Sequence, residues 1–401
     1  MFRKFVSVYH FVREYGEHLP LAGKAIFNIS CTITTIRGSI RGCGKPILVL
    51  YVGRRWNYDF LVDLMLEEHE IVSQANVTLF TARSRSRSLA ADADIEIVDV
   101  CWPYVGRFNR EGGYLEFTDW LNMTLSLKQD WKSTIRSFRK TTRNNDLRLI
   151  RRNQYRFEVT NDPEIIDAFY DDMYVSSASR RHGTASIIAP KKHVLKRARQ
   201  GKLLQVYRGD EVVIAGVIYP EADVLYFLWQ GSPPQFQERA PEGSASALYY
   251  FGIRYAFDND ISAVDFAGTR AFLDFGDFRF KRKWGARVDD AFSPNSVLMR
   301  PLNNQANTVS FCEQFPVIAC CDDGLEAVIV RRDDTVDSDT LRRLDKHYNC
   351  DGLARTVLIL VSDPAHAGAT TMELNDHEFH VIQCHPDQFA SRYVERALSN
   401  D

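Results

Sequence analysis

The chain has 401 residues, of which 45% are hydrophobic, 25% charged and 12% aromatic. These fractions are typical of a globular protein and exclude a disordered, collagenous or coiled-coil chain. Eight cysteines are too few for a disulfide scaffold, and no apolar run reaches the ~18 residues that a membrane-spanning helix needs. We therefore expect a reduced, cytoplasmic protein. Two or three domains are predicted, because single cores stop growing near ~250–300 residues.

Charge is distributed unevenly, although the net charge is only −2. Residues 1–300 hold 42 Lys and Arg against 35 Asp and Glu, whereas residues 301–401 hold 8 against 17. The change falls at the polar stretch 301–305 and predicts a boundary before an acidic C-terminal α/β domain. Residues 1–45 carry seven basic and two acidic residues. We expect a basic N-terminal arm there, with peripheral membrane contact as one candidate role.

Residues 46–114 alternate between predicted strands and helices. Short apolar runs predict strands at 47–52, 77–80 and 95–98, and apolar residues three and four apart predict a helix over 57–68. No glycine-rich phosphate loop joins a strand to a helix here. The Arg-Ser run at 83–88 has no interleaved aromatic residue, which favours a solvated loop over a nucleic-acid contact.

A strongly basic helix is predicted over residues 131–145. Its apolar stripe consists of Trp131, Ile135, Phe138 and Thr142. Residues 131–156 hold nine basic residues and one acid, a net charge of +8. The pattern fits either a solvated amphipathic helix or a surface for an anionic ligand, and the residues alone leave both open.

After two further helices the apolar period changes from 3.6 to 2. The first helix begins with Asp162 and Pro163 and is expected to bury Ile165, Ile166, Phe169 and Met173; the second spans 190–200. Three antiparallel strands follow, at 203–208, 211–219 and 224–229. A loop rich in proline and glycine, a helix at 244–259 and a strand at 261–266 complete the order.

This order resembles the GNAT superfamily of acyltransferases, and within it the Fem/CelD-like branch. Four features carry the resemblance: the basic helix at 133–140, Arg181-His182-Gly183, the strands with helix 244–259 and Val264-Asp265-Phe266, and the Phe-Lys-Arg-Lys-Trp-Gly-Ala ending at 280–286. The resemblance covers residues 115–300. It implies a mixed α/β sheet in a GNAT-like domain, and transfer of an acyl or aminoacyl group from a thioester or aminoacyl-tRNA.

One element of the superfamily is absent. Residues 239–245 have one residue too many to match the Arg/Gln-x-x-Gly-x-Gly/Ala loop that holds acetyl-CoA. Acyl-CoA, including acetyl-CoA, is therefore one candidate donor and charged tRNA another. The implied acceptor is a small-molecule or lipid-linked anion, such as a sugar or cell-envelope precursor. A GNAT-fold binding protein without catalysis is the alternative.

Acyl transfer needs a base for the nucleophile, and three residues are catalytic candidates. His182 is one, because histidine can act as a base at neutral pH. Asp265 lies on a strand between apolar residues and is a base, a substrate anchor or a buried aspartate neutralised by Arg270. Lys281 is implied by the resemblance, facing a phosphate or carboxylate. We expect Lys281→Ala to reduce activity with little change in melting temperature.

The remaining candidates bind ligands. The donor is assigned to Gly243, Ser244 and Ser246, where helix N–H groups can bind phosphate, although Ser244 also fits a simple cap. Gln230 is a candidate for an acyl amide. Trp229 is a core aromatic or a substrate contact, at the point where a GNAT-like sheet would splay. The acceptor is assigned to a positive pocket from separate parts of the chain, with Arg136, Arg139, Arg181 and Lys283.

The acidic C-terminal domain shows elements but no clear chemistry. A hairpin is predicted from 316–320 to 325–330, a helix at 338–348 and a strand at 357–361. His377, His380 and Cys384 have a zinc-like combination of ligand types, but residues three apart on a strand face opposite sides, so we expect no metal. We expect the chain without residues 305–401 to remain folded.

Overall fold

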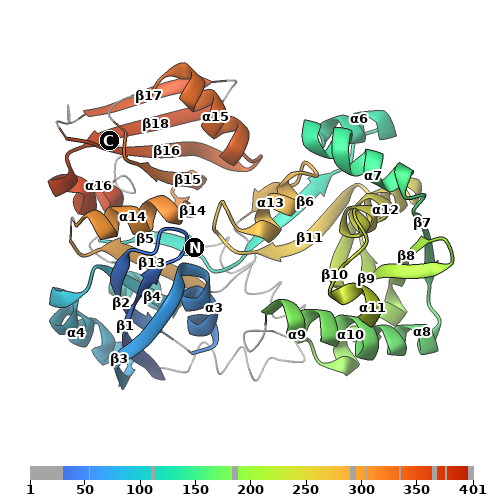
Figure 1. Cartoon of the computed structure of the whole chain (residues 1–401), viewed down its shortest axis with the longest axis horizontal. Coiled ribbons are helices and arrows are strands. Elements are labelled where there is room, and N and C mark those ends of the chain that lie inside the picture. The colour runs from blue at the N-terminus through green and yellow to red at the C-terminus, as the bar shows by residue number, and fades with distance from the viewer. Residues whose placement is uncertain are drawn as a thin grey trace. The chain divides into compact units, whose positions relative to one another are not determined.

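The computed structural model describes residues 30–53, 55–109, 113–182, 188–289, 295–303, 305–333, 336–363, 368–374 and 377–395. The chain divides into two compact units, and Figure 1 labels most of their elements. Unit 1 comprises residues 1–121, 269–279 and 288–401, and unit 2 comprises residues 122–268 and 280–287. Both contain helices and mixed sheets, which confirms the predicted α/β class.

The N-terminal part of unit 1 forms a six-stranded sheet in the order β3-β1-β2-β4-β13-β5. Only β2 and β4 run parallel among its described pairs. The strands are β1 (Ser30–Ile40), β2 (Pro46–Gly53), β3 (Leu66–Thr78), β4 (Ile95–Cys101), β5 (Leu115–Thr118) and β13 (Asn295–Pro301). Its helices are α3 (Arg55–Met65), α4 (Leu79–Leu89) and α5 (Trp102–Phe108), and a 3-10 turn spans Ala90–Asp92. Apolar residues of α4 and α5 pack against β2 and β4.

Three local predictions in this sheet were wrong in part. The predicted helix 57–68 ends at Met65, because β3 begins at Leu66 and pairs with β1. The predicted strand 77–80 is divided, since Thr78 caps α4 and the helix begins at Leu79. The Arg-Ser run lies in α4 rather than in a loop: Ala82 and Ser86 face the interior, so the run has a buried side.

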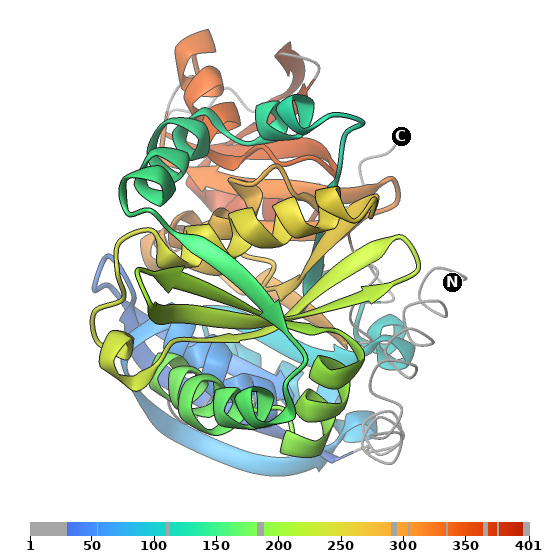
Figure 2. The same ribbon diagram turned by 90° about the vertical axis from the view of Figure 1, so that its right-hand side faces the viewer.

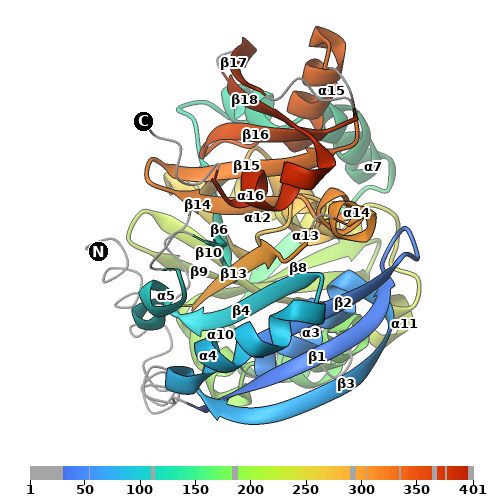
Figure 3. The same cartoon turned by 90° about the vertical axis from the view of Figure 1, so that its left-hand side faces the viewer.

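The C-terminal part of unit 1 is a five-stranded sheet in the order β14-β15-β16-β18-β17, visible in Figure 3. The predicted hairpin, helix and strand are confirmed as β14 (Val317–Cys321), β15 (Gly324–Arg331), α15 (Ser338–Tyr348) and β16 (Leu353–Val361). The remaining elements are α14 (Ala306–Gln314), β17 (Gly368–Leu374), β18 (His377–Cys384), α16 (Phe389–Glu395) and a 3-10 turn at Pro386–Gln388.

Unit 2 is built on a seven-stranded sheet in the order β12-β6-β11-β10-β9-β8-β7. Its strands are β6 (Leu121–Ser126), β7 (Arg156–Thr160), β8 (Lys202–Arg208), β9 (Glu211–Glu221), β10 (Val224–Gly231), β11 (Ala263–Thr269) and β12 (Arg287–Asp289). Strands β7 to β10 are antiparallel neighbours, whereas β10 and β11 are parallel. The predicted three-strand order with its following helix and strand is thus confirmed.

Helices cover both faces of this sheet, with α12 on one face and α8 to α10 on the other (Figure 2). The helices are α6 (Trp131–Ser137), α7 (Leu147–Arg152), α8 (Pro163–Ala168), α9 (Ser176–His182), α10 (Lys191–Gln200), α11 (Pro234–Gln237), α12 (Ser244–Asp258) and α13 (Gly276–Arg282). Two π-helical segments lie at Thr142–Asp146 and Phe169–Val175. Ile165, predicted as buried, is exposed, while Ile166 and Phe169 are in the core.

The predicted basic helix 131–145 is interrupted after Ser137. Phe138 has an extended backbone and packs its buried ring on Trp284, with ring centroids 5.2 Å apart. The carbonyl oxygen of Lys283 accepts from the Arg139 amide over 3.0 Å and from Thr142 Oγ1 over 2.9 Å. These bonds to a distant segment replace helical ones, which local periodicity does not reveal.

The limits of unit 2 are narrower than the predicted domain 115–300. Strands β5 and β13, which lie at the two ends of that range, pair with each other in the sheet of unit 1. Residues 30–40 of the predicted N-terminal arm form β1, and residues 1–29 lie outside the described residues. No helix in the described ranges is long and apolar enough to cross a membrane.

Candidate active site

Two neighbouring strands of unit 2 part from each other in mid-course. The parallel strands β10 and β11 pair at only three positions, the last of which joins Tyr226 to Asp265. β10 then continues to Gly231 and β11 to Thr269. The register between β10 and β9 also shifts between Phe227 and Gln230, as in a β-bulge. Pairing thus ends three residues before Trp229, where the sequence placed the splay.

Asp265 lies at this point of separation. Its side chain is held at both carboxylate oxygens: Oδ2 accepts from Asn122 Nδ2 over 2.6 Å, and Oδ1 accepts from the Ala267 amide over 2.7 Å. Asp265 is only 8% exposed. Ala267 has a φ of 61°, a left-handed conformation that is uncommon for alanine. A buried carboxylate and a strained turn therefore occupy the end of the paired region.

Lys281 binds the same turn from another part of the chain. It lies on α13 and is 4% exposed, and its Nζ donates to the carbonyl oxygens of Gly268 over 2.7 Å and Ala267 over 3.4 Å. A buried ammonium group requires such acceptors, because its transfer from water is costly. The structure thus brings Asp265 and Lys281, two of the predicted catalytic residues, to one turn.

The start of α12 contains an internal carboxylate. Ser246 Oγ donates to Asp146 Oδ1 over 2.6 Å, and Lys283 Nζ donates to the same oxygen over 2.8 Å and to Ser246 Oγ over 3.2 Å. Lys283 also lies over the Phe280 ring, 4.2 Å from its centroid. Ser246 and Lys283, predicted for donor and acceptor respectively, therefore meet in one cluster with Asp146, which sequence reasoning missed.

The glycine and serine before this cluster have structural roles. Gly243 is the N-terminal capping residue of α12 and has a φ of 84°. A Cβ at this position would meet Leu149 Cβ of α7 at 3.2 Å. Ser244 is buried, and its amide donates to the Pro241 carbonyl over 3.0 Å. The amides of Ala245 and Ser246 come next, in the first turn, where N–H groups have no intrahelical partner.

At the end of β10, Trp229 is part of the packing with the helices. Its ring lies 5.4 Å from the His193 ring and 6.3 Å from the Tyr174 ring. These contacts match the core interpretation of Trp229. Gln230 pairs with Gly216 of β9 just beyond the bulge. A Cβ on the next residue, Gly231, would overlap the Met173 carbonyl, so a glycine is needed there.

The predicted acceptor residues are only partly described. Arg136 is exposed and lines a hollow of about 540 Å³ with Lys128, Gln129, Asp130, Ser133 and Ser137. Arg139 is half-buried, and its amide binds Lys283 as described above. Arg181 and His182 end α9, but their side chains lie outside the described structure. The four predicted acceptor residues are Arg136, Arg139, Arg181 and Lys283, and their convergence in one pocket therefore stays a prediction.

Asn122 is the second functional candidate that sequence reasoning missed. It lies on β6, where Leu121, Met123 and Leu125 are buried and Asn122 and Thr124 are half-buried. This alternation is visible in the sequence and indicates a strand with one polar face. The contact with Asp265, which is 143 residues away, has no local signal.

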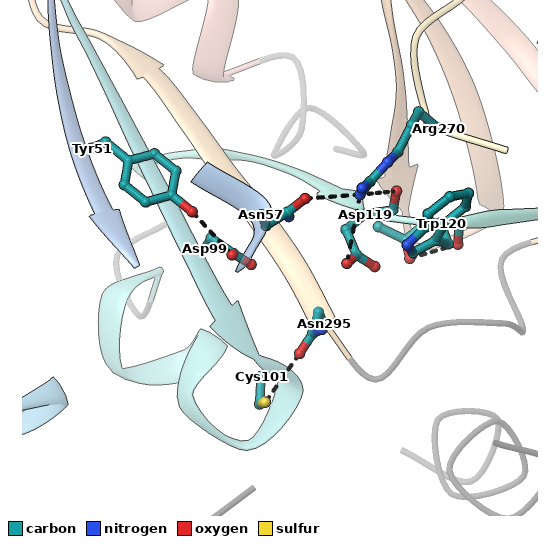
Figure 4. A network of polar contacts seen from close by, with 9 residues as sticks. Tyr51, Asn57, Asp99, Cys101, Asp119, Trp120, Arg270 and Asn295 are labelled. Carbon is teal, nitrogen blue, oxygen red and sulfur yellow. Dashed lines mark hydrogen bonds and ion pairs between the residues drawn. The ribbon is translucent and has the colours of Figure 1, made fainter. Parts of the chain in front are cut away.

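A separate buried polar network lies in unit 1 (Figure 4). Arg270, predicted as a partner of Asp265, donates to Asn57 Oδ1 over 2.9 Å and to the Asp119 carbonyl over 3.3 Å. Its guanidinium lies between the rings of Phe60 and Trp120, at 4.0 and 4.1 Å. Burial lowers the pKa of Arg270 and is offset in part by Asp119. These contacts anchor the segment that follows β11.

In the same network, Tyr51 donates to Asp99 Oδ2 over 3.1 Å. Burial and the Asp99 carboxylate raise the pKa of Tyr51 well above its ordinary value, so this hydroxyl stays protonated and donates. Among the residues that the structure describes, no group of three or more His, Cys, Asp or Glu side chains is arranged to hold a metal ion.

Comparison with known proteins identifies the domain that contains this site. Residues 136–282 match the family model described as an acetyltransferase (GNAT) domain. No curated protein matches the chain. Similar solved structures include FemX, with 11% identity over 66% of this chain and 83% of that chain and a TM-score of 0.36.

L-PGS of Bacillus licheniformis has 12% identity over 69% of this chain and 86% of its own, with a TM-score of 0.32. A GCN5-related N-acetyltransferase of Sphaerobacter thermophilus has 12% identity over 64% and 73%, with a TM-score of 0.30. The assignment rests on the family model, which includes β7 to β11 and ends at Arg282 beside Lys281. The chain is therefore an acyltransferase with a GNAT-type acetyltransferase domain.

Proposed function

We propose that the chain transfers an acyl or aminoacyl group from a thioester or an aminoacyl-tRNA to an anionic acceptor, as in the Fem/CelD-like branch that its sequence resembles. A small-molecule or lipid-linked precursor of a polysaccharide or of the cell envelope is the proposed acceptor, and the cytoplasm the proposed compartment. The separation of β10 from β11 beside Asp265, inside the matched domain, carries the proposal.

Asp265 is the proposed base. It takes a proton from the acceptor's nucleophile as that atom bonds to the acyl carbon, and the sulfur or tRNA oxygen leaves with the electron pair of the broken bond. Leu228 and Trp229 lie within the register shift of β10, outside the paired positions. Their backbone amides are the proposed donors to the oxyanion, because such donors stabilise charge that develops on the carbonyl oxygen.

The donor's phosphate groups are assigned to the first turn of α12. The amides of Ser244 and Ala247 bond the carbonyls of Pro241 and Gly243, and the amides of Ala245 and Ser246, which lie between them in the first turn, are the proposed phosphate donors. Asp146 lies against Ser246, but Lys283 offsets its charge. Because Lys283 is paired with Asp146, the proposed contacts to the donor's phosphates come from backbone amides and not from a further cation. This proposal agrees with the lack of the usual acetyl-CoA loop.

The acceptor is assigned to Arg136 of α6, Arg139 just after that helix and Arg181 of α9, with His182 as a further proton carrier. Lys132, Arg136, Lys140 and Arg148 are exposed, so the segment that bears the +8 charge keeps most of it accessible. A charged tRNA is the alternative use of this surface, since phosphate contacts make binding strongly dependent on salt.

The test is to incubate the full chain with acetyl-CoA or with a mixture of aminoacyl-tRNAs, together with sugar phosphates and nucleotide sugars, and to detect acylated product by mass spectrometry. Product from wild type and none from Asp265→Asn is the expected result. Binding that weakens steeply between low and moderate salt would favour tRNA, and a weak salt dependence would favour acyl-CoA. Full activity in the Asp265→Asn variant would exclude the proposed base.

A further inference from the structure

The amide side chain of Asn122 contacts the proposed base from the neighbouring strand. In the sheet, β6 is adjacent to β11 on the side away from β10. Asp265 therefore has Tyr226 opposite it on β10 and Asn122 on β6, with the Asn122 Nδ2 group 2.6 Å from Oδ2. This is a short hydrogen bond, as expected where the acceptor is a carboxylate.

Two neutral donors hold the carboxylate from opposite ends. The Ala267 amide binds Oδ1 and belongs to the strained turn, while Asn122 binds Oδ2 from a regular strand. The cation that faces this turn is Lys281, whose ammonium donates to the carbonyls of Ala267 and Gly268. Hydrogen bonds donated to a carboxylate stabilise its ionised form, and both donors contact Asp265 in this way.

The face of β6 that bears Asn122 is not a core face. Leu121, Met123 and Leu125 are buried on the other side, whereas Asn122 and Thr124 are half-buried. An asparagine that only filled the core would leave polar atoms without water or partners, at a cost. Here one polar atom of the side chain is committed to Asp265, while Asn122 itself stays half-buried.

We propose that Asn122 is the positioning residue for the base in the acyl transfer. This inference rests on the proposed function, in which Asp265 takes the proton of the acceptor's nucleophile. Asn122 binds one carboxylate oxygen and the Ala267 amide binds the other, so the plane of the Asp265 carboxylate is held from both sides. Asn122 thus fixes the orientation of the carboxylate and keeps it ionised, without itself touching the reacting atoms.

The first measurement is the pKa of Asp265, by carbon NMR of protein labelled at the aspartate carboxyl carbons, with the signal assigned through Asp265→Asn. Asn122→Ala should raise this pKa by about one unit, because a donor to the ionised form is lost. Asn122→Asp should raise it further, since two carboxylates would be adjacent. Thr124→Ala, on the same face of β6, is the matched control and should leave it unchanged.

The second measurement is acetyl-CoA consumption, followed as release of the CoA thiol, as a function of pH. The acidic limb of kcat should move upward in Asn122→Ala by the same amount as the pKa, with lower kcat and an unchanged KM for acetyl-CoA. Melting temperatures of the variants show whether each is folded. Thr124→Ala should keep the wild-type profile.

The two measurements separate the possible failures. An unchanged pKa of Asp265 in both Asn122 variants overturns the positioning role, whatever the activity. A raised pKa with an unmoved acidic limb shows that Asp265 is not the base, which overturns the inference together with the proposed mechanism. If wild type does not consume acetyl-CoA, the acetyl donor is wrong, and the pKa comparison still decides the role of Asn122.

Discussion

The buried ammonium group of Lys281 changes what its removal should do. Lys281 is 4% exposed and donates to the carbonyl oxygens of Ala267 and Gly268. The sequence suggested a ligand contact whose loss leaves the melting temperature unchanged. The structure argues otherwise, because two buried carbonyls lose a donor, and unsatisfied polar groups of this kind cost about 1–3 kcal/mol.

We predict that Lys281→Met lowers the free energy of unfolding by about 1–3 kcal/mol, measured by chemical denaturation. Methionine keeps most of the length of the side chain, so the change isolates the lost donor. Lys132→Met is the control on an exposed lysine of α6 and should alter stability by less than about 0.5 kcal/mol. Equal stability of the two variants would show that the turn does not depend on Lys281.

His377 gives the C-terminal sheet a dependence on pH. Burial lowers its pKa from the ordinary value of 6.5, and its Nε2 lies 2.8 Å from Thr356 Oγ1. Above pH 6.5 the histidine is neutral in the folded and the unfolded chain, so it adds no pH dependence. Below that pH the unfolded chain binds a proton first, so stability falls as the pH falls.

We predict that wild type loses at most about 1.4 kcal/mol per pH unit from this group below its unfolded pKa. His377→Gln keeps a hydrogen-bonding amide and removes the titration. Denaturation curves between neutral and mildly acidic pH should therefore fall less steeply for the variant than for wild type. A parallel decline in both proteins would assign the acid sensitivity to other groups.

At the scale of elements, packing opposes helix propensity inside α12. Gly252 lies in the middle of this helix, where alanine is favoured over glycine by about 1 kcal/mol. A Cβ at Gly252 would overlap the ring of Phe227, which is buried between Tyr249 and Phe266. The glycine therefore makes room for the Phe227 ring of β10 against α12.

We predict that Gly252→Ala destabilises the chain by about 1–3 kcal/mol in spite of the gain in propensity, because overpacking outweighs it. The double variant Gly252→Ala with Phe227→Leu should recover part of this loss, since leucine leaves room for the methyl group. The coupling between the two changes in a double-mutant cycle is the measurement. Independent, additive effects would contradict the proposed contact.

The same elements show what the sequence predicted and what it did not. Strands β8 to β10 and helix α12 were predicted because their periodicity and turns are local. The break in the basic helix was not predicted, because it depends on hydrogen bonds from Arg139 and Thr142 to the distant Lys283 carbonyl. Of the predicted site, Asp265 and Lys281 meet at one turn, but the contacts of Asn122 and Asp146 join residues too distant for any local pattern.

At the scale of the whole molecule, the chain passes several times from one unit to the other. The changes in composition along the sequence indicate fewer boundaries than this. Residues 269–279, which begin at the last residue of β11, belong to unit 1, and β13 returns to pair with β4 and β5. Non-local pairings of this kind leave no signature in charge or periodicity. The charge balance does change at residues 301–305, yet the residues on both sides of this change belong to unit 1.

The acidic C-terminal region is bonded to the segment that follows β11. Phe272 forms a bridge with Val317, the Leu273 amide donates to Pro316 over 2.9 Å, and the Ile318 amide donates to Ala271 over 2.8 Å. Phe272 and Leu273 are buried in unit 1. Removing residues 305–401 would expose these side chains and leave backbone groups without partners, each of which is unfavourable.

We therefore predict that the chain without residues 305–401 is less stable than the full chain and prone to aggregation. The change in charge at residues 301–305 had suggested instead that the truncated chain remains folded. Size-exclusion chromatography and thermal unfolding of the two proteins are the measurements. Phe272→Ala in the full chain is the milder companion variant, and loss of a buried phenylalanine should cost about 3–5 kcal/mol. A monomeric truncated chain with the melting temperature of the full chain would show that the change in charge at residues 301–305 marks a true domain boundary. In that case the contacts around Phe272 would add little to the stability of unit 1.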